Sequence, residues 1–551
     1  MWTSTLELSI KKIVSTQILG MVWRGAYFSS LAPLQVHNLP RQALTSHQGN
    51  WVRVHNRLAG ICGSDLHLVF ANGDPRIAPA ALPTHQGSSY PGHEVIGEVI
   101  EIGDQVQNLQ AGDRVVLQSG PNCLTAGVQP PCDACATGNY SLCSKGALSS
   151  PQQIGGGWSE EMLVHEQQLF RIPPEMEDEQ AVLLEPTAVA VHAVLRRLPR
   201  AGEKVLIVGS GTIGLLILQV IRALAPQAEV TVMARHSFQV EQATRMGAAH
   251  ILYGSDNYSS IEKATGGKLY QGMLGNRMLL GGYDVIFDSV SSRQTTHDCL
   301  RWARARGTVV MVGVYLRPMQ IDLSPIWYQE VNLIGSMAHG TEEWPAGSGH
   351  ERSTFAIASD LITNRLLHPE KLITHRFALS NFRDALQTAS DKKNSRAIKV
   401  VFDALLLPAS SVPTTRPAAY TRLPRLNFSP GQAQSSSPDT SSLPPLTPVA
   451  QSAPSTGPSH FTMAQSEDFT ADFDNAQFVP SKPQPVANFD NEQFIAPKPQ
   501  RPPTPLLFRP TDDLPQTPQP IGPSTVINTP SRTLQQTGGP DDNPMAVRSS
   551  E

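Results

Sequence analysis

Four of the six cysteines in this 551-residue chain lie close together, at a spacing that suits metal binding. They are Cys123, Cys132, Cys135 and Cys143. A closed tetrahedral zinc site needs four such thiolates, and the eight residues between Cys123 and Cys132 are rich enough in turn formers to fold back. The sequence therefore predicts a structural zinc ion, which would stabilise the fold without taking part in a reaction. Chance clustering is the alternative.

A second set of metal-ligand types is spread more widely: Cys62, His93, Glu94 and Glu185. Thiolate, imidazole and carboxylate ligands are typical of catalytic zinc sites, which leave one position open. Each residue also has an ordinary explanation. The cysteine could be packed in the core, the histidine could be hydrogen-bonded there, and the glutamate before Pro186 could cap a helix. Together they predict a catalytic zinc site.

A glycine motif follows a buried apolar run at 205–208 and opens an apolar stretch that reads as a helix to about residue 224. It consists of Gly209, Ser210, Gly211, Thr212, Ile213 and Gly214. Glycines in this strand-to-helix context allow a tight turn and close approach of the backbone to a pyrophosphate at the helix N-terminus. The motif predicts dinucleotide binding; a merely structural turn is the alternative.

The choice between NAD(H) and NADP(H) is made near the end of the following strand. An acidic residue there binds the ribose hydroxyls of NAD, but this chain reads Thr-Val-Met-Ala-Arg-His from 231 to 236. Arg235 is suited to pair with the 2′-phosphate of NADP(H), so we expect NADP(H) to be favoured over NAD(H). Otherwise Arg235 would be an ordinary surface residue.

Two patterns divide the folded part of the chain. Short alternating apolar runs, such as 51–54 and 95–100, predict a mostly-β first part. From Lys204, strand-like and helix-like stretches alternate, which predicts an α/β fold with a doubly wound parallel sheet. The expected ranges are 1–28 (an uncertain extension), 29–186 (the catalytic domain), 187–320 (the nucleotide-binding domain), 321–403 (a return to the catalytic domain) and 404–551 (a tail).

The tail is predicted to be disordered, because it contains 27 of the 46 prolines and few large apolar residues. Within it, Phe473-Asp-Asn-Ala-Gln-Phe returns as Phe489-Asp-Asn-Glu-Gln-Phe. This repeat is either a pair of short motifs for a protein partner or drift after a duplication.

Charge and hydropathy exclude several classes of partner. The net charge is -4 and no long basic run is present, so nothing favours nucleic acid. No apolar stretch is long enough to predict a membrane span, and the N-terminus lacks a signal-peptide core. Clustered cysteines with metal spacing favour a reducing compartment. We therefore expect a cytoplasmic protein, with a mitochondrial presequence as the alternative.

The order of these motifs resembles a known family. Cys62-Gly-Ser-Asp-Leu-His67, Gly92-His93-Glu94, the four cysteines, Leu184-Glu185-Pro186 and the glycine motif follow one another as in the zinc-dependent medium-chain dehydrogenases/reductases of the alcohol dehydrogenase superfamily. The polyol and threonine dehydrogenase branch is the most similar. Over residues 30–403, the resemblance implies a GroES-like catalytic domain, a Rossmann domain, two Zn²⁺ ions per subunit, and a homodimer or homotetramer.

The resemblance also implies roles for individual residues. Cys62 and His93 would be ligands of the catalytic zinc, and both Glu94 and Glu185 fall on positions that have served as ligands. Ser64 would be the hydroxyl of a proton relay, and His67 would pass the proton to solvent. Asp65 is expected to orient the site.

This chain departs from the family pattern at three places. Gln129 stands where the family has its first clustered cysteine, so Cys123 must substitute for it across a longer loop. Residues 72–90 are rich in proline and alanine, and the N-terminus before about residue 29 does not resemble the family's opening strands.

The resemblance implies an enzyme that transfers a hydride between an alcohol or polyol and NADP(H) or NAD(H), with a small alcohol or carbonyl compound as its substrate. Two alternatives remain open at this stage. One is an inactive dehydrogenase fold that acts as a scaffold through its tail motifs. The other is a zinc-independent reductase of the same superfamily.

Overall fold

The computed structural model describes residues 2–406, except for positions 10, 11, 13, 14, 17, 21, 22, 42, 46, 47, 71, 73–87, 146–153, 255 and 256. Both copies of the Phe-Asp-Asn repeat, and nearly all of the predicted tail, therefore lie outside the described residues. So does most of the 72–90 segment.

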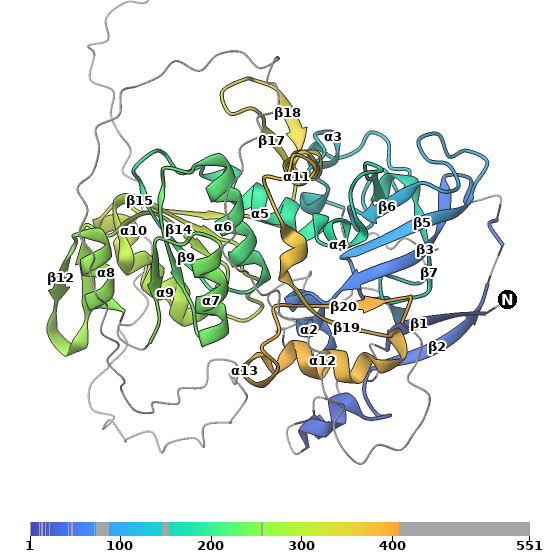
Figure 1. The fold of residues 1–551 in the computed structure, drawn as a ribbon, viewed down its shortest axis with the longest axis horizontal. Helices are drawn as coiled ribbons and strands as arrows, with labels where there is room; N and C mark the ends of the chain where they lie inside the picture. Colours follow the sequence, from blue (N-terminus) through green and yellow to red (C-terminus); the bar gives the residue numbers. More distant parts are fainter. Residues whose placement is uncertain are drawn as a thin grey trace, which may run out of the picture. The chain divides into compact units, whose positions relative to one another are not determined.

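A six-stranded parallel sheet forms the nucleotide-binding domain (Figure 1). Its strands, in spatial order, are β11 (His250–Leu252), β10 (Glu229–Met233), β9 (Lys204–Val208), β14 (Tyr283–Asp288), β15 (Ala303–Met311) and β16 (Asn332–Gly335). All adjacent pairs are parallel. The predicted doubly wound sheet is thus confirmed, and the strand order reverses between β9 and β14, where such folds bind ligands.

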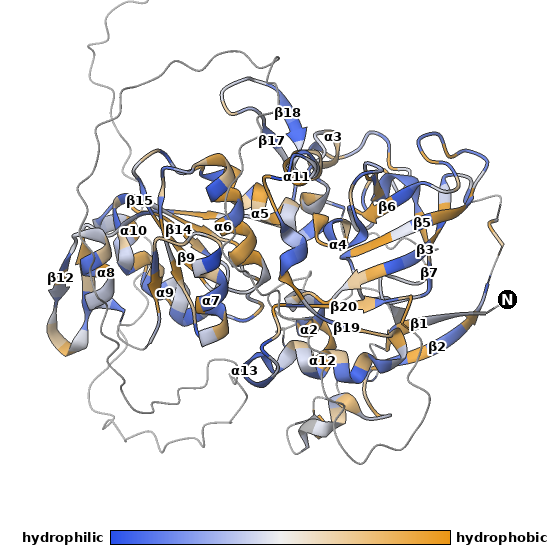
Figure 2. Cartoon of the chain, viewed as in Figure 1, coloured by the Kyte–Doolittle hydropathy of each residue, from blue (hydrophilic) through white to orange (hydrophobic). Residues whose placement is uncertain are grey.

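Helices connect these strands. They are α6 (Thr212–Leu224), α7 (Ser237–Arg245), α8 (Tyr258–Thr265) and α9 (Arg293–Trp302), with the short α10 (Ser324–Tyr328) before β16. A two-stranded hairpin, β12 (Lys268–Gln271) and β13 (Arg277–Leu280), lies between α8 and β14. Because residues 205–208 of β9 are buried on both faces, this strand reads as an uninterrupted apolar run. In Figure 2, the strands of this sheet and helix α6 are largely coloured as hydrophobic.

The nucleotide-binding domain extends further than the expected 187–320. Strand β16 pairs in parallel with β15 and is the edge strand of the sheet, so the chain leaves this domain only after Gly335. The sequence placed the boundary too early because four residues with two half-buried positions give too short an apolar run to mark a strand.

A seven-stranded sheet forms the catalytic domain, in the order β19-β20-β3-β5-β6-β8, with β7 also paired to β3. The strands are β3 (Trp51–Gly60), β5 (Val95–Ile102), β6 (Arg114–Leu117), β7 (Glu161–His165), β8 (Leu169–Arg171), β19 (Ile373–Phe377) and β20 (Lys399–Asp403). Strand β20 runs antiparallel to β3. Through β19 and β20 the late segment thus joins the sheet of the first domain.

The N-terminal range 1–28, which the sequence left uncertain, contributes a strand. Strand β1 (Trp2–Ser9) pairs with β2 (Leu34–Pro40) and with β4 (Ser88–Ser89). Leu6 and Leu8 of β1 are fully buried and belong to the apolar core of the catalytic domain. This part of the extension is thus built into the fold.

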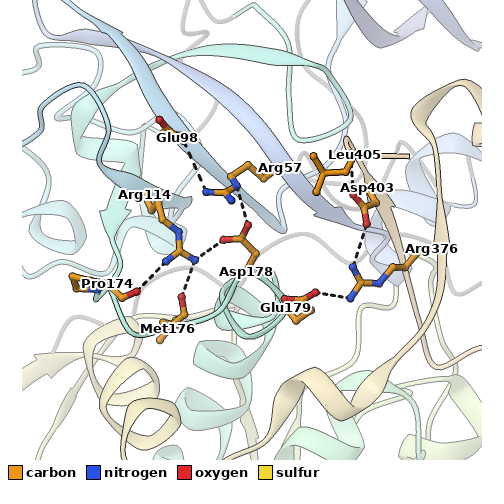
Figure 3. Close-up of polar contacts among 10 residues, drawn as sticks. All are labelled: Arg57, Glu98, Arg114, Pro174, Met176, Asp178, Glu179, Arg376, Asp403 and Leu405. Carbon is orange, nitrogen blue, oxygen red and sulfur yellow. Dashed lines mark hydrogen bonds and ion pairs between the residues drawn. The ribbon is translucent and has the colours of Figure 1, made fainter. Parts of the chain in front are cut away.

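Ion pairs attach the short helix α4 (Asp178–Ala181) to the catalytic sheet (Figure 3). Asp178 pairs with Arg114 of β6, and its other oxygen lies 2.9 Å from Nε of Arg57. Glu179 pairs with Arg376, which also binds Asp403 at the end of β20. The same segment continues into α5 (Leu184–Arg196), so these contacts help to position a helix that begins beside the candidate site.

Candidate active site

The register of two strands brings the second ligand set together. Cys62 lies just after β3, at the N-cap of α2 (Gly63–Val69), and Glu94 directly precedes β5. Because β3 and β5 are antiparallel and pair Ala59 with Val95, the end of one strand meets the beginning of the other. The ligand atoms of Cys62, His93 and Glu94 lie within 4.8 Å of one another.

Asp65 fixes the orientation of two of these ligands. One of its oxygens accepts a hydrogen bond from the backbone N–H of Cys62 (3.0 Å), and the other lies 3.3 Å from Nδ1 of His93. The imidazole thereby keeps Nε2 for a metal ion. Burial would raise the pKa of Asp65, but the charge and hydrogen bond of His93 outweigh it and lower that pKa. The side chain is therefore a carboxylate whose contacts suit the orienting role predicted for it.

Glu94 is buried between a cation and the ligand set. Its Oε2 lies 2.5 Å from Nζ of Lys399, whose ammonium group also donates to the carbonyl oxygen of Ile61 (3.2 Å). Among the described residues, Oε1 of Glu94 has no hydrogen-bond partner although it is buried. An acceptor without a partner is costly inside a protein. A thiolate, an imidazole and this free oxygen suit Zn²⁺.

Lys399 is a residue of the candidate site that sequence reasoning missed. Its side chain is only 2% exposed, and it stands within the otherwise apolar run Ala397–Phe402. Since lysine is almost never buried without a partner, a lysine in a core strand was the available signal. The identity of its partner depends on the pairing of β20 with β3.

Glu185 occupies a different place from Glu94. It lies in the first turn of α5 and is not among the ligand atoms that converge within 4.8 Å. Instead it lines a pocket of about 440 Å³ together with His93. Burial raises the pKa of Glu185 to about 7, so this carboxyl group can hold a proton near neutral pH.

The two relay residues lie on α2. Ser64 Oγ is 3.5 Å from Nε2 of His93, and His67 is one turn further along the same helix face. Burial, assisted by the positive charges of Arg317 and Lys392, lowers the pKa of His67. The imidazole is therefore neutral at pH 7 and able to accept a proton.

The four clustered cysteines converge on one point. Their sulfur atoms lie within 4.8 Å of one another, and all four are free thiols. Cys123 Sγ is 3.7 Å from Cys143 Sγ, close to the ~3.8 Å between two sulfurs that each lie about 2.3 Å from one tetrahedral zinc ion. The loop at 124–131 folds back so that Cys123, and not Gln129, completes the set. The cluster suits a structural zinc ion.

The glycine motif has the geometry that a pyrophosphate requires. Gly209 has φ 93°, and a Cβ on Gly214 would lie 1.9 Å from the carbonyl oxygen of Gly209. In contrast, a Cβ on Gly211, the N-cap of α6, would meet nothing within 4 Å. Gly209 and Gly214 are thus required by the turn itself, whereas the space at Gly211 is open to a ligand.

The three other residues of the motif differ in their burial and in their contacts. Ser210 is buried, and its hydroxyl has no partner among the described residues. Thr212 donates to the carbonyl oxygen of Ile398 (3.0 Å), which joins α6 to the catalytic domain. Ile213 is partly buried against the apolar core.

Arg235 is exposed and follows β10 at the carboxyl edge of the sheet. Because β10 pairs with β9 so that Met233 lies opposite Val208, Arg235 and the glycine motif share one edge. Its backbone N–H donates to Oε1 of Gln239 (3.2 Å).

Comparisons with known proteins agree with this arrangement. The alcohol dehydrogenase GroES-like domain matches residues 48–174, and the zinc-binding dehydrogenase model matches residues 212–349. The L-idonate 5-dehydrogenase of Vitis vinifera is 28% identical over 64% of this chain and 87% of its own length.

Solved structures show the same fold. The 2R,3R-butanediol dehydrogenase of Bacillus subtilis is 25% identical and aligns with a TM-score of 0.52 over 67% of this chain and 96% of its own. An alcohol dehydrogenase of Escherichia coli CFT073, in complex with NADH, is 22% identical and aligns with a TM-score of 0.56 over 73% of this chain and 99% of its own.

Within the described part of the chain, no helix is both long and apolar enough to cross a membrane.

Proposed function

The chain belongs to the zinc-dependent medium-chain alcohol dehydrogenase family, in its polyol dehydrogenase-like branch, and from this membership we propose how its own residues bind zinc and NADP(H) to oxidise an alcohol. It is an oxidoreductase that uses zinc and a nicotinamide cofactor. The observation that carries the detailed proposal is the convergence of Cys62, His93 and Glu94 beside the pocket.

Two zinc ions per subunit have different tasks. The four-cysteine cluster holds a structural ion, and Cys62, His93 and Glu94 hold the catalytic one, with Glu185 facing the pocket beside them. The catalytic ion supplies Lewis acidity that makes the substrate hydroxyl easier to deprotonate. The free oxygen of Glu94 and the orientation of His93 by Asp65 support this assignment.

The chain's own groups then move the proton. Ser64 lies close enough to His93 to take a proton from a hydroxyl bound there, and His67, neutral at pH 7, accepts it on the route to solvent. The glycine motif holds the cofactor's pyrophosphate at the N-terminus of α6. When bound there, the nicotinamide ring of the cofactor would supply the hydride-accepting chemistry.

Arg235 gives the preference for NADP(H). The residue follows β10 at the sheet edge that carries the glycine motif, where the adenosine ribose is bound in this fold, and a phosphate suits its guanidinium group. Arg235→Ala should raise KM for NADP(H) at least tenfold and change KM for NAD(H) little. Equal effects on both cofactors, or a strong preference of the wild type for NAD(H), would contradict this role.

Elemental analysis of zinc, combined with an assay of alcohol oxidation, tests the assignment. The wild type should contain two zinc ions per subunit. Cys62→Ser should contain one and lose turnover, because one ligand of the catalytic site is gone. A variant that keeps two ions or full activity would refute the role of Cys62. A wild type that contains only one zinc ion, as Cys62→Ser does, and shows no turnover would instead favour the scaffold alternative.

The remaining expectations concern the oligomeric state, the cellular localisation and the tail. We infer a homodimer or homotetramer with a small alcohol or carbonyl substrate, in the cytoplasm, and a protein partner for the tail. Light scattering after size exclusion would give the subunit number. Deletion of residues 404–551 should leave turnover unchanged, because every candidate site residue precedes that range.

A further inference from the structure

We propose that Asn122 links the four-cysteine cluster to the substrate pocket, so that a metal ion held by the four thiols also positions the pocket wall at residues 118–121. This inference rests on the proposed function, because it assumes that the pocket beside His93 binds the alcohol. It gives the structural metal ion a second task, the placement of the substrate, in addition to the stabilisation of the fold.

Both ends of the four-cysteine segment lie next to the pocket wall along the chain. Pro121 and Ser141 line the same pocket as His93. Cys123 follows Pro121 by two residues, and Cys143 follows Ser141 by two residues. Because Sγ of Cys123 lies 3.7 Å from Sγ of Cys143, a metal ion bound by both thiols fixes two separate parts of the wall to one point.

The position of Cys123 departs from the family pattern in a way that bears on the wall. In that pattern the first clustered cysteine falls at the position of Gln129, which lies six residues further along the chain. With Cys123 as the ligand, only Asn122 separates the cluster from the pocket-lining Pro121. The metal site of this chain is therefore coupled to the wall through a very short connection.

The side chain of Asn122 bridges the wall and the cluster. The residue is only 1% exposed. Its Nδ2 donates to Oγ of Ser119 (3.3 Å) and to the carbonyl oxygen of Gly120 (3.2 Å), and both of these residues line the pocket. Its Oδ1 accepts a hydrogen bond from the backbone N–H of Leu124 (2.9 Å), on the other side of Cys123. One buried amide group thus holds residues on both sides of a metal ligand.

A second buried amide, that of Gln168, holds the start of the same wall on the catalytic sheet. Gln168 directly precedes β8 and is fully buried. The backbone N–H of Gln118 donates to its carbonyl oxygen (2.7 Å), and its Nε2 donates to the carbonyl oxygen of Ser119 (3.0 Å). The wall is therefore held at its start by the sheet and at its end by Asn122 beside the cluster.

The other end of the four-cysteine segment is hydrogen-bonded to the wall as well. Ser141 lies in the short helix η4 (Tyr140–Leu142), which directly precedes the fourth cysteine. Just before this helix, Oδ1 of Asn139 accepts a hydrogen bond from the backbone N–H of Thr341 (3.0 Å), two residues after the pocket-lining His339. Both ends of the segment thus contact a part of the pocket wall.

Loss of the structural metal ion should loosen the wall and leave the reacting groups in place. Without the ion the four thiols have no common partner, so the two wall parts beside Cys123 and Cys143 lose their shared anchor. The residues assigned to the catalytic zinc ion lie outside this segment. We therefore expect weaker binding of the alcohol and an unchanged chemical step, which together give a higher KM at the same kcat.

Kinetics of the full-length protein test the role of Asn122. We would measure zinc content, and kcat and KM for 2-butanol, sorbitol and benzyl alcohol with NADP⁺, in the wild type and in Asn122→Ala, which keeps all four thiols. Gln48→Ala is the matched control. Gln48 is also a buried amide (5% exposed), but its partner, the backbone N–H of Thr45 (3.0 Å), belongs to a residue that is not among the described residues lining the pocket.

Asn122→Ala should keep the zinc content of the wild type. Its KM should rise by roughly fivefold to tenfold, the scale of one or two lost hydrogen bonds, while kcat stays within about twofold. Gln48→Ala should lower the midpoint of thermal unfolding without a change in KM, as a purely structural amide would. An unchanged KM in Asn122→Ala, or a fall in kcat alone, would overturn the role of Asn122.

Hydrogen exchange tests the part of the metal ion without any substrate. Cys62→Ser should carry zinc at the four-cysteine cluster alone, so a chelator changes only that site. Mass spectrometry should then show faster amide exchange in peptides that cover 118–121 and 139–142, and the same exchange as before in β10 of the other domain. Unchanged exchange at the wall, or an equal rise in β10, would overturn the coupling.

Failure of this proposal can be separated from failure of the proposed function. A wild type that oxidises none of the three alcohols contradicts the function itself, and the exchange experiment still decides whether the metal ion positions the wall. An active wild type whose KM is matched by that of Asn122→Ala overturns the coupling and leaves the function intact. The exchange experiment does not use Asn122→Ala, so its result stands even if that variant does not fold.

Discussion

Replacing Lys399 by methionine would isolate a buried charge at the centre of the candidate site. Nζ of Lys399 lies 2.5 Å from Oε2 of Glu94, and the two side chains are 2% and 1% exposed. Methionine has a similar length and no charge, so Lys399→Met removes the cation while filling most of its volume. The Glu94 carboxylate then remains buried without its partner, and the carbonyl oxygen of Ile61 loses a donor.

The expected loss of stability follows from that burial. Removing one partner of a buried ion pair costs about 3–5 kcal/mol. The entropy of unfolding is about 2 cal/mol/K per residue near the midpoint, so a fold over residues 2–406 has roughly 0.8 kcal/mol/K. The midpoint of thermal unfolding should therefore drop by about 4–6 °C.

Scanning calorimetry of wild type and Lys399→Met, both freed of zinc with a chelator, would measure this shift, because a bound zinc ion would itself compensate the charge of Glu94; zinc content is determined on the same samples. The double variant Lys399→Met/Glu94→Gln serves as the control, since it removes both charges and should recover most of the lost stability. A drop below 1 °C for Lys399→Met, or a double variant no more stable than the single one, would refute the view that this ion pair compensates the burial of Glu94.

Three further outcomes are expected. Gly214→Ala should destabilise the nucleotide-binding domain and prevent cofactor binding because its Cβ would collide with the carbonyl oxygen of Gly209, whereas Gly211→Ala should keep the unfolding temperature and only weaken NADPH binding, as fluorescence titration can measure. Cys123→Ser should lose one zinc ion by elemental analysis and lower the unfolding temperature, because a structural site needs all four ligands; retention of both ions would exclude Cys123 from the cluster. The pKa of His339 is about 4 in the fold and 6.5 in the unfolded chain, so its neutral form contributes stability above pH 6.5 that is lost as the pH falls from 6.5 towards 4. The midpoint of thermal unfolding should therefore change less between pH 6.5 and pH 4 in His339→Phe than in the wild type. An equal change in both proteins would contradict this.

The sequence by itself determined the parts of this protein that depend on local order. The apolar run before Gly209 and the helix after it follow from residue types within one turn or strand, and the fold confirms both. Cys62 and the clustered cysteines could be recognised because metal ligands are few in type and their spacing along the chain limits how they can meet.

Only the tertiary structure decided which distant groups meet. The pairing of β20 with β3 brings Lys399 to Glu94, and no spacing rule connects positions so far apart. Both Glu94 and Glu185 were candidate ligands, and packing separated them: one converges with Cys62 and His93, the other faces the pocket. His339 likewise becomes part of the pocket through the path of the chain after β16. Burial and charge at a site are properties of the assembled fold, because they depend on neighbours that sequence order does not specify.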